Sequence, residues 1–315
     1  MSSRPPFVLA FGGNALLPDP FQPGEQEARA RELARSVLLL GERSPGRGGL
    51  VLVHGNGPQV GMILLRVEGT RERIPAEPLD VLVAETQGSI GYLLSRALRN
   101  ALVAQSSAVE VTTVLTQVVV DPQDPAFAQP TKPIGPQYSG EAAQLFRQRG
   151  WHMVATDGRG WRRAVPSPRP LRVVELPAIR AAARPGQVVI AGGWGGVPVR
   201  EDSPGGYSGV EAVIDKDRTA ALLAHALEAE GFVILTGVPR VAQGFGTAAE
   251  RPLSRVSARH MRALLGAGEF PPGSMGPKVE AACDYVEQSG RAALITDTEH
   301  LERALRGEDG TWIEP

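Results

Sequence analysis

Two glycine turns early in the chain contain residues that could bind an anion. Gly12-Gly13-Asn14 follows the apolar run FVLAF, and Gly55-Asn56-Gly57 follows the apolar run LVLVH. A glycine turn between a strand and a helix presents backbone N–H groups beside the helix N-terminus, where an anion is stabilised. Either turn alone could be purely structural, but the pair favours a cradle for an oxyanion or a phosphoryl group. The first turn contains neither lysine nor arginine, so a phosphate there needs positive charge from elsewhere.

Three lysines in other parts of the chain could supply that charge. Lys216 lies between Asp215 and Asp217, where an apolar run meets a helical pattern. The lysine could bind phosphate while one of the aspartates orients it. Alternatively, one of the aspartates could simply cap the helix. Lys278 falls in the first turn of a predicted helix, where the helix dipole disfavours a cation, and this local cost favours a functional role. Lys132 stands in PTKPIGP, whose prolines could fix its position or could belong to a rigid exposed linker.

The composition limits the classes of partner and the compartment. A net charge of −1 over 315 residues lacks the basic excess of proteins that bind nucleic acid or anionic membranes, so we expect neither as a partner. The single cysteine, Cys283, fits a reducing compartment and a small core residue. Because the start of the chain lacks a signal-peptide pattern, and no window approaches the roughly 20 apolar residues of a membrane span, we expect a cytoplasmic protein.

Short apolar runs alternate with longer helical patterns along the chain. The runs predict strands over 7–11, 50–54, 111–120, 187–191, 232–236 and 292–296. The main helical patterns cover 25–43, 79–102, 219–231 and 278–290. This alternation predicts an α/β fold with a mainly parallel sheet covered on both faces, and such sheets bind ligands at the carboxyl ends of their strands.

The segment from 121 to 170 departs from this pattern because it is rich in proline. Prolines at this frequency disfavour packed helices and central strands. We expect a protruding lobe or lid of irregular structure and edge hairpins, which Phe127, Tyr138, Trp151 and Trp161 could pack together. A flexible linker is the alternative.

Several motifs together resemble the carbamate kinases of the amino-acid-kinase superfamily. They are FGGNALL, VHGNGPQVG, TQGSIGYLL, TQVVVDPQDPAF, PTKPIGP, GWRRAVPSPRP, GVEAVIDKD and GSMGPKVEAA, in the order and approximate spacing of that family over nearly the whole chain. The resemblance implies one amino-acid-kinase domain over 1–315, a three-layer αβα sandwich with a mainly parallel central sheet. It implies a lobe for carbamate or carbamoyl phosphate over about 1–205, with a protruding subdomain over about 121–170, a nucleotide lobe over about 206–315, and a homodimer.

The resemblance also implies a reaction and a set of site residues. The reaction is reversible phosphoryl transfer between ATP and carbamate, in the catabolism of arginine or another source of carbamoyl phosphate. Mg²⁺ would be held by the nucleotide phosphates, with no metal ligand from the protein. Lys132, Lys216 and Lys278 would neutralise the phosphoryl oxygens, and Asp217 would organise the lysines. The residues around the carbamoyl end and the transferred group would be Gly12, Gly13, Asn14, Gly55, Asn56 and Gly57. The nucleotide-binding residues would be Thr236, Gly237, Val238, Ala242, Phe245, Gly273, Ser274, Met275 and Gly276.

Two departures from the family pattern bear on function. The family has a stretch close to ILTDVDAVYLNFG beside the nucleotide, whereas this chain has ILTGVPRVAQGFG, with Gly237, Pro239, Arg240 and Ala242 at the changed positions. Trp194, in IAGGWGGVPV, interrupts the usual glycine run; its side chain could turn outward and pack on the lid, or it could narrow a site. Smaller changes, Glu85 and Ser89 where apolar or aromatic residues are expected, could alter the dimer face.

These features leave three hypotheses. The first is a working carbamate kinase, because every lysine and glycine of the phosphoryl path is present. The second is a carbamate-kinase-like protein with weakened ATP use, acting as a ligand-binding or regulatory subunit with a partner such as a carbamoyltransferase. The third is a kinase for another small acid, which Trp194 could select.

Overall fold

The computed structural model describes residues 5–12, 25–42, 48–56, 59–156, 160–271 and 273–315. An eight-stranded sheet forms its centre, in the order β15-β17-β16-β12-β1-β2-β9-β3. The strands are β1 (Phe7–Phe11), β2 (Leu50–His54), β3 (Glu110–Thr113), β9 (Gln187–Ile190), β12 (Gly231–Leu235), β15 (Arg255–Ser257), β16 (Ala293–Thr296) and β17 (Thr311–Glu314). The pairings are parallel except for β16 with β17, so the predicted mainly parallel α/β fold is confirmed.

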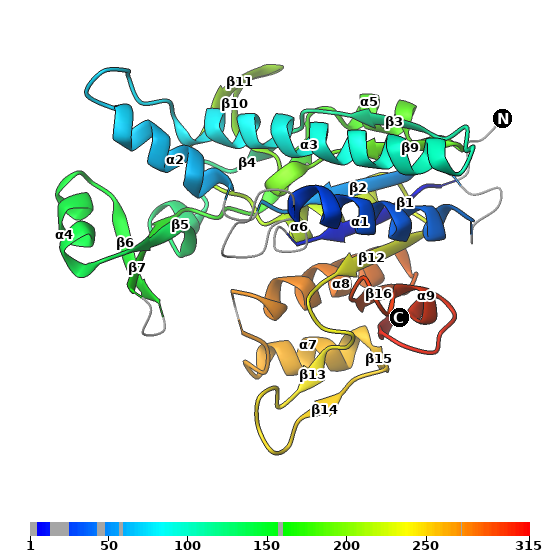
Figure 1. The fold of residues 1–315 in the computed structure, drawn as a ribbon. Coiled ribbons are helices and arrows are strands. Elements are labelled where there is room, and N and C mark those ends of the chain that lie inside the picture. Colours follow the sequence, from blue (N-terminus) through cyan, green and yellow to red (C-terminus); the bar gives the residue numbers. More distant parts are fainter. Residues whose placement is uncertain (1–4, 13–24, 43–47, 57–58, 157–159, 272) are drawn as a thin grey trace.

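Helices cover both faces of this sheet, as Figure 1 shows. In β1, Val8 and Ala10 belong to one buried cluster while Leu9 and Phe11 belong to the other, because successive side chains of a strand point to opposite faces. One face packs against α1 (Glu25–Glu42), α3 (Leu79–Ala104) and α9 (Leu301–Leu305). The other packs against α5 (Leu176–Ala182), α6 (Lys216–Ala226), α7 (Ala258–Gly266) and α8 (Met275–Ser289). Because both faces of the sheet are buried, its strands are continuous apolar runs in the sequence.

The prediction of one strand over 111–120 is wrong. The chain leaves the central sheet after β3 and resumes as β4 (Gln117–Val120) in a second sheet, ordered β11-β10-β4-β8. Hydrogen bonds from distant residues cause the break: the side chain of Gln87 bonds both the N–H and the carbonyl of Thr116, and the Thr116 hydroxyl accepts the N–H of Gly192. The other strands of this sheet are β8 (Pro170–Val173), β10 (Val197–Ser203) and β11 (Gly206–Gly209).

The proline-rich segment is more regular than predicted. After the short turn η2 (Pro125–Phe127), it forms an antiparallel sheet of β5 (Lys132–Tyr138), β7 (Gly160–Val165) and β6 (His152–Thr156), with α4 (Gly140–Gln148) against it. We call these four elements the lid, which projects from the main body in Figure 1. Tyr138, Phe146 and Trp151 pack as an aromatic cluster in it, with the rings of the last two stacked at 4.4 Å. The prolines are tolerated because β5 is an edge strand.

Three shorter elements and α2 complete the description. Helix α2 (Gln59–Thr70) follows β2 and packs against β5 and α3. The turn η3 (Gly193–Gly195) follows β9. The hairpin of β13 (Ala242–Gln243) and β14 (Arg251–Pro252) is joined to the segment after α7 by the Gly244 N–H, which donates to the Glu269 carboxylate. No helix in the described ranges is long and apolar enough to cross a membrane.

Candidate active site

A cavity of about 170 Å³ lies beyond the carboxyl end of β2 and brings together segments far apart in the sequence. Lys132 from the lid, Lys216 from the start of α6 and Lys278 from the first turn of α8 all line it. They are the only lysines in the chain of 315 residues, although lysine and arginine together number 33. The structure thus places every lysine of the protein around one small cavity. In the sequence, the rarity of lysine could by itself have indicated a shared site for all three lysines.

Asp215 both caps α6 and pairs with the lid. Its Oδ1 accepts the backbone N–H of Asp217 at 2.9 Å, and its Oδ2 lies 2.6 Å from Lys132 Nζ. Burial opposes the ionisation of this carboxyl, but the charges of Lys132 and Lys216 outweigh it and hold the pKa of Asp215 well below its usual range. Asp215 therefore has both of the functions considered from the sequence, because one carboxylate caps α6 and orients a lysine. It stays ionised and fixes the lid lysine at the start of α6.

Asp217 holds the other two lysines. Its Oδ1 lies 2.5 Å from Lys216 Nζ and its Oδ2 lies 3.1 Å from Lys278 Nζ, and the aspartate side chain is only 3% exposed. Burial lowers the pKa of Lys216, and the charge of Asp217 opposes that shift. One carboxylate between two ammonium groups offsets their mutual repulsion, so both cations can remain at the same wall of the cavity.

The two glycine turns begin side by side. Phe11 pairs with His54 in the parallel register of β1 and β2, and the N–H of Gly55 donates to the carbonyl of Phe11 at 2.8 Å. Gly12 directly follows β1. Gly55 and Asn56 line the cavity. The other predicted residues of these turns, Gly13, Asn14 and Gly57, lie outside the described residues.

Asn56 is oriented by the helix that follows it. Its Oδ1 accepts the N–H of Val60 at 3.3 Å, near the start of α2. Its Nδ2 is buried, and no hydrogen-bond partner for it occurs among the described residues. A buried amide group of this kind is costly unless something satisfies it, so Asn56 is suited to donate to a ligand in the cavity.

Several side chains that line the cavity were not among the predicted site residues, including Arg162 and Ile214, and neither was the adjacent His54. Arg162 of β7 lines the cavity and donates from Nε to the carbonyl of Gly135 at 2.9 Å. Ile214 lines it next to Asp215. His54 is buried just before Gly55; because a carbonyl only accepts hydrogen bonds, its Nδ1, 3.1 Å from the Gly55 carbonyl, must carry a proton. The motifs contain these residues, but nothing in their spacing marks them as members of the site.

Trp194 faces inward. It is 8% exposed, lines the cavity and belongs to the same buried cluster as Ile134 and Val165 of the lid. It therefore combines the two alternatives, since it packs against the lid and also takes up space at the site. Its backbone has φ 53° and ψ 31°, in the left-handed region that favours glycine.

Sequence and structure comparisons agree with this geometry. The model of the amino acid kinase family matches residues 5–297. The carbamate kinase-like protein YahI of Escherichia coli is 45% identical over 311 residues, covering 97% of this chain and 98% of that protein. A carbamate kinase of Thermococcus kodakarensis is 42% identical over 310 residues, with 97% and 98% covered. The carbamate kinase of Giardia lamblia bound to AMP-PNP superposes with a TM-score of 0.90 and 36% identity, covering 100% of this chain and 99% of that one.

The chain belongs to the carbamate kinases of the amino acid kinase family. The resemblance inferred from the motifs is confirmed, and so is the enzyme class, a phosphotransferase with a carboxyl-group acceptor.

The residues that the carbamate kinase pattern assigns to the nucleotide lie at the start of α8 and after β12. Gly273 and Ser274 line the cavity, and Met275 and Gly276 open α8. Thr236 follows β12 and donates its N–H to the Thr296 carbonyl at 2.8 Å. Gly237 and Val238 come next, Ala242 pairs with Pro252 in the small hairpin, and Phe245 is 63% exposed beyond it. Of these residues, Gly273 and Ser274 line the lysine cavity, whereas Thr236, Gly237, Val238, Ala242 and Phe245 do not.

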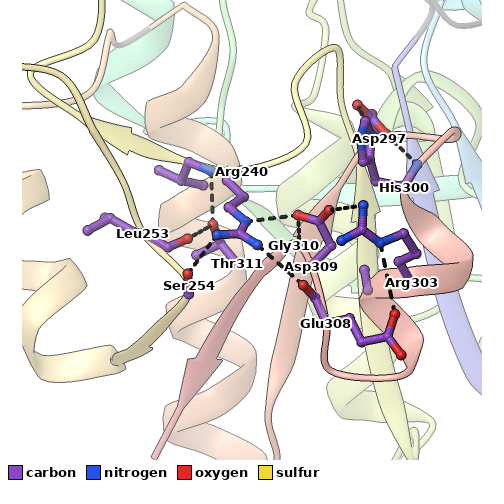
Figure 2. Close-up of polar contacts among 12 residues, drawn as sticks. Arg240, Leu253, Ser254, Asp297, His300, Arg303, Glu308, Asp309, Gly310 and Thr311 are labelled. Atoms are coloured by element: carbon purple, nitrogen blue, oxygen red, sulfur yellow. Dashed lines mark hydrogen bonds and ion pairs between the residues drawn. The ribbon is translucent and has the colours of Figure 1, made fainter.

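Arg240, a departure from the carbamate kinase pattern, has a structural role. Figure 2 shows its guanidinium directed toward the C-terminal segment, where Nε donates to Asp309 at 2.8 Å and Nη1 donates to the Ser254 hydroxyl at 2.9 Å. The next N–H, of Val241, donates to the Thr311 hydroxyl at 2.9 Å. The altered loop is therefore anchored by its own network, and the arginine does not line the cavity.

Proposed function

We propose that the protein transfers a phosphoryl group reversibly between carbamoyl phosphate and ADP, forming ATP and carbamate, which breaks down to ammonia and carbon dioxide. The convergence of the only three lysines on one cavity, each held by an aspartate, carries this proposal. This reaction would take part in the catabolism of arginine or of another source of carbamoyl phosphate. The single buried Cys283 supports a reducing compartment such as the cytoplasm.

The transferred group would lie among Lys132, Lys216 and Lys278. Three ammonium groups against two carboxylates leave one net positive charge among these five groups, and Arg162 adds another positive charge to the cavity lining. Each ammonium has three donors, of which its aspartate occupies only some. Phosphoryl transfer requires in-line positioning and stabilisation of charge on the phosphoryl oxygens. Ammonium groups already fixed by Asp215 and Asp217 meet that need with little reorganisation.

The carbamoyl end would bind at the glycine turns. The Nδ2 of Asn56 would donate to its oxygens, and Gly12, Gly13, Asn14, Gly55 and Gly57 would surround it, with the Gly55 N–H itself held by the Phe11 carbonyl. In this arrangement the lobe over about 1–205 holds the acceptor. The lobe over about 206–315 holds the nucleotide.

The nucleotide would bind across α8 and the loop after β12. Gly273 to Gly276 would approach its phosphates at the helix N-terminus, where the helix dipole favours an anion, although the N–H groups of Ser274 and Gly276 already donate to the Pro271 carbonyl. Thr236, Gly237, Val238, Ala242 and Phe245 would border the base and ribose. The solved Giardia carbamate kinase contains AMP-PNP, which supports a nucleotide site in this fold.

Mg²⁺ would arrive with the nucleotide. Within the described residues, no group of three or more His, Cys, Asp or Glu side chains could hold a metal ion, and the carboxylates of Asp215 and Asp217 are bound by lysines. Mg²⁺ commonly binds through substrate phosphates and at most one or two carboxylates, so these residues fit an ion carried in on the phosphates. When bound, it would neutralise negative charge on those phosphates.

We further propose that two copies associate through α2 and α3. Ile74, Val81 and Tyr92 are exposed on this side of the protein, and a groove of about 580 Å³ lined by residues from Gln59 to Ser89 lies between the helices. Exposed apolar side chains around one groove are typical of an interface between protein chains. Sedimentation should show a dimer that Tyr92→Glu weakens. The matched variant Leu171→Glu, at an exposed leucine of β8, should leave it intact.

The decisive assay is ATP formation from ADP, Mg²⁺ and carbamoyl phosphate by the purified protein. Lys278→Ala should abolish it, and Lys278→Arg should not restore it, because a guanidinium differs from an ammonium in size and geometry. No turnover by well-folded protein would contradict the proposal. Calorimetry then separates the remaining hypotheses: binding of carbamoyl phosphate without ADP or ATP would indicate a ligand-binding subunit.

The lysine content permits a second, independent test. Reductive methylation modifies amines, so only Lys132, Lys216, Lys278 and the N-terminus can react. ADP with carbamoyl phosphate should slow methylation of the three lysines and leave the N-terminus unchanged. Equal rates with and without ligands would place the ligands elsewhere.

A further inference from the structure

Trp194 lines the cavity and lies in the turn η3, directly after β9. Strand β9 pairs with β2 and β2 pairs with β1, all parallel, so η3 lies at the same end of the sheet as the two glycine turns that follow β1 and β2. Strand β12 lies on the other side of β1 in the sheet order. Trp194 is therefore next to the strand that precedes Gly55 and is separated by β2 and β1 from the loop after β12 that is assigned to the nucleotide.

The backbone at Trp194 is held in a conformation that disfavours a large side chain. Its φ of 53° lies in the left-handed region, and the neighbouring Gly192 and Gly195 also have positive φ values of 63° and 84°. Two hydrogen bonds fix the turn: Gly192 N–H donates to the Thr116 hydroxyl at 2.9 Å, and the Thr219 hydroxyl donates to the Gly195 carbonyl at 2.8 Å. Glycine would adopt this turn without strain, so the tryptophan is retained despite a local cost, as at many functional positions.

We propose that Trp194 sets the upper size limit of the acceptor, an inference that rests on the proposed function. With the phosphoryl group among the lysines, the substituent on the acyl carbon of the substrate points toward the glycine turns and the indole. The cavity of about 170 Å³ is smaller than the roughly 300–1,000 Å³ of sites for drug-sized ligands. An amino or methyl substituent fits this space, whereas a longer alkyl chain meets the indole.

A series of acyl phosphates tests this proposal. ATP formation from ADP is measured with carbamoyl, acetyl, propionyl and butyryl phosphate, and kcat/KM is determined for each. We expect Trp194→Gly to raise the ratio of kcat/KM for butyryl over carbamoyl phosphate by about tenfold or more, since one methylene in a closed pocket is worth about 10–200-fold. Trp194→Phe should give an intermediate ratio. Because glycine suits the backbone at this position, the first variant should fold.

Trp151 offers a matched control. It belongs to the same buried cluster as Trp194, but it does not line the cavity. Trp151→Leu should leave the butyryl-to-carbamoyl ratio within about twofold of the wild-type value, even if the loss of ring stacking lowers stability. An unchanged ratio in Trp194→Gly, or an equal change in Trp151→Leu, would overturn the proposal, because the effect would then be absent or due to general loosening of the lid.

The failure of the proposed function can be told apart from the failure of this inference. If the wild-type protein makes no ATP, the proposed activity is wrong. Calorimetry with non-reactive phosphonates still tests whether Trp194 limits the size of the ligand. We expect Trp194→Gly to increase the affinity for N,N-diethylphosphonoacetamide relative to phosphonoacetamide by about tenfold or more. The same relative affinity in wild type and variant would reject Trp194 as the size limit.

Discussion

The buried imidazole of His54 should make the stability of the protein depend on pH in a predictable window. The residue ends β2 and is 2% exposed, and burial lowers its pKa from 6.5 to about 4, although the hydrogen bond to the Gly55 carbonyl opposes that shift. The folded protein therefore keeps this ring neutral at pH values where the unfolded chain protonates it. His54 lies directly behind the turn assigned to the carbamoyl end.

The size of the effect follows from the two pKa values. Between about pH 6.5 and pH 4 the unfolded chain binds one more proton at His54 than the folded protein does. The free energy of unfolding is therefore unaffected by this group above about pH 6.5 and falls by about 1.4 kcal/mol for each pH unit below it. The total loss at this one residue reaches about 3 kcal/mol near pH 4.

Chemical denaturation of wild type and His54→Asn at several pH values measures this contribution. The asparagine amide can still donate to the Gly55 carbonyl, but it does not titrate. Between pH 7.5 and pH 4.5, we expect the wild type to lose about 2–3 kcal/mol more free energy of unfolding than the variant. The exposed His152 provides the control, since His152→Asn should follow the wild-type curve. Parallel curves for wild type and His54→Asn would refute the reasoning.

Three further predictions concern residues inside and outside the cavity. Asp217→Asn removes the carboxylate between two lysines. ATP formation should therefore fall by about 100-fold, and the free energy of unfolding should fall by about 3 kcal/mol. As a control, Asp202→Asn at an exposed ion pair should lower the free energy of unfolding by less than about 1 kcal/mol. Arg240→Ala should lower the melting temperature through loss of the Asp309 contact but change KM for ADP by less than about twofold, because the guanidinium points away from the cavity. Burial raises the pKa of Cys283 to about 12, so iodoacetamide at pH 8 should label the unfolded chain and spare the native one, as mass spectrometry would show.

The sequence predicted β1, β2, β9, β12 and β16 well because burial on both faces makes them continuous apolar runs, whereas the short strands β15 and β17 of the same sheet were not predicted. The run over 111–120 has the same composition, yet it belongs to two sheets. Its break at Thr116 depends on hydrogen bonds with Gln87 and Gly192, which are distant in the sequence. A local pattern cannot contain that information.

The same distinction separates the predicted and unpredicted parts of the site. The motifs predicted that the three lysines belong to one site, and the structure brings them to one cavity; the register of β1 and β2 places the starts of the two glycine turns together. The roles of Trp194 and Arg240 could not be assigned, because they depend on the direction of the side chain. Trp194 points into the cavity through a left-handed backbone, whereas Arg240 points away through its contact with Asp309.

The choice between lysine and arginine in this chain separates two uses of positive charge. Arginine serves the structural ion pairs, such as Arg240 with Asp309 and Arg262 with Glu287, where several planar donors fix a geometry. Lysine occurs only at the cavity, where a compact ammonium can be held by an aspartate and still present N–H groups to a phosphoryl oxygen. The two aspartates also offset two of the three lysine charges, which limits how tightly the lysines bind any one phosphate. In the proposed reversible reaction, that balance would let the same lysines release ATP in one direction and carbamoyl phosphate in the other.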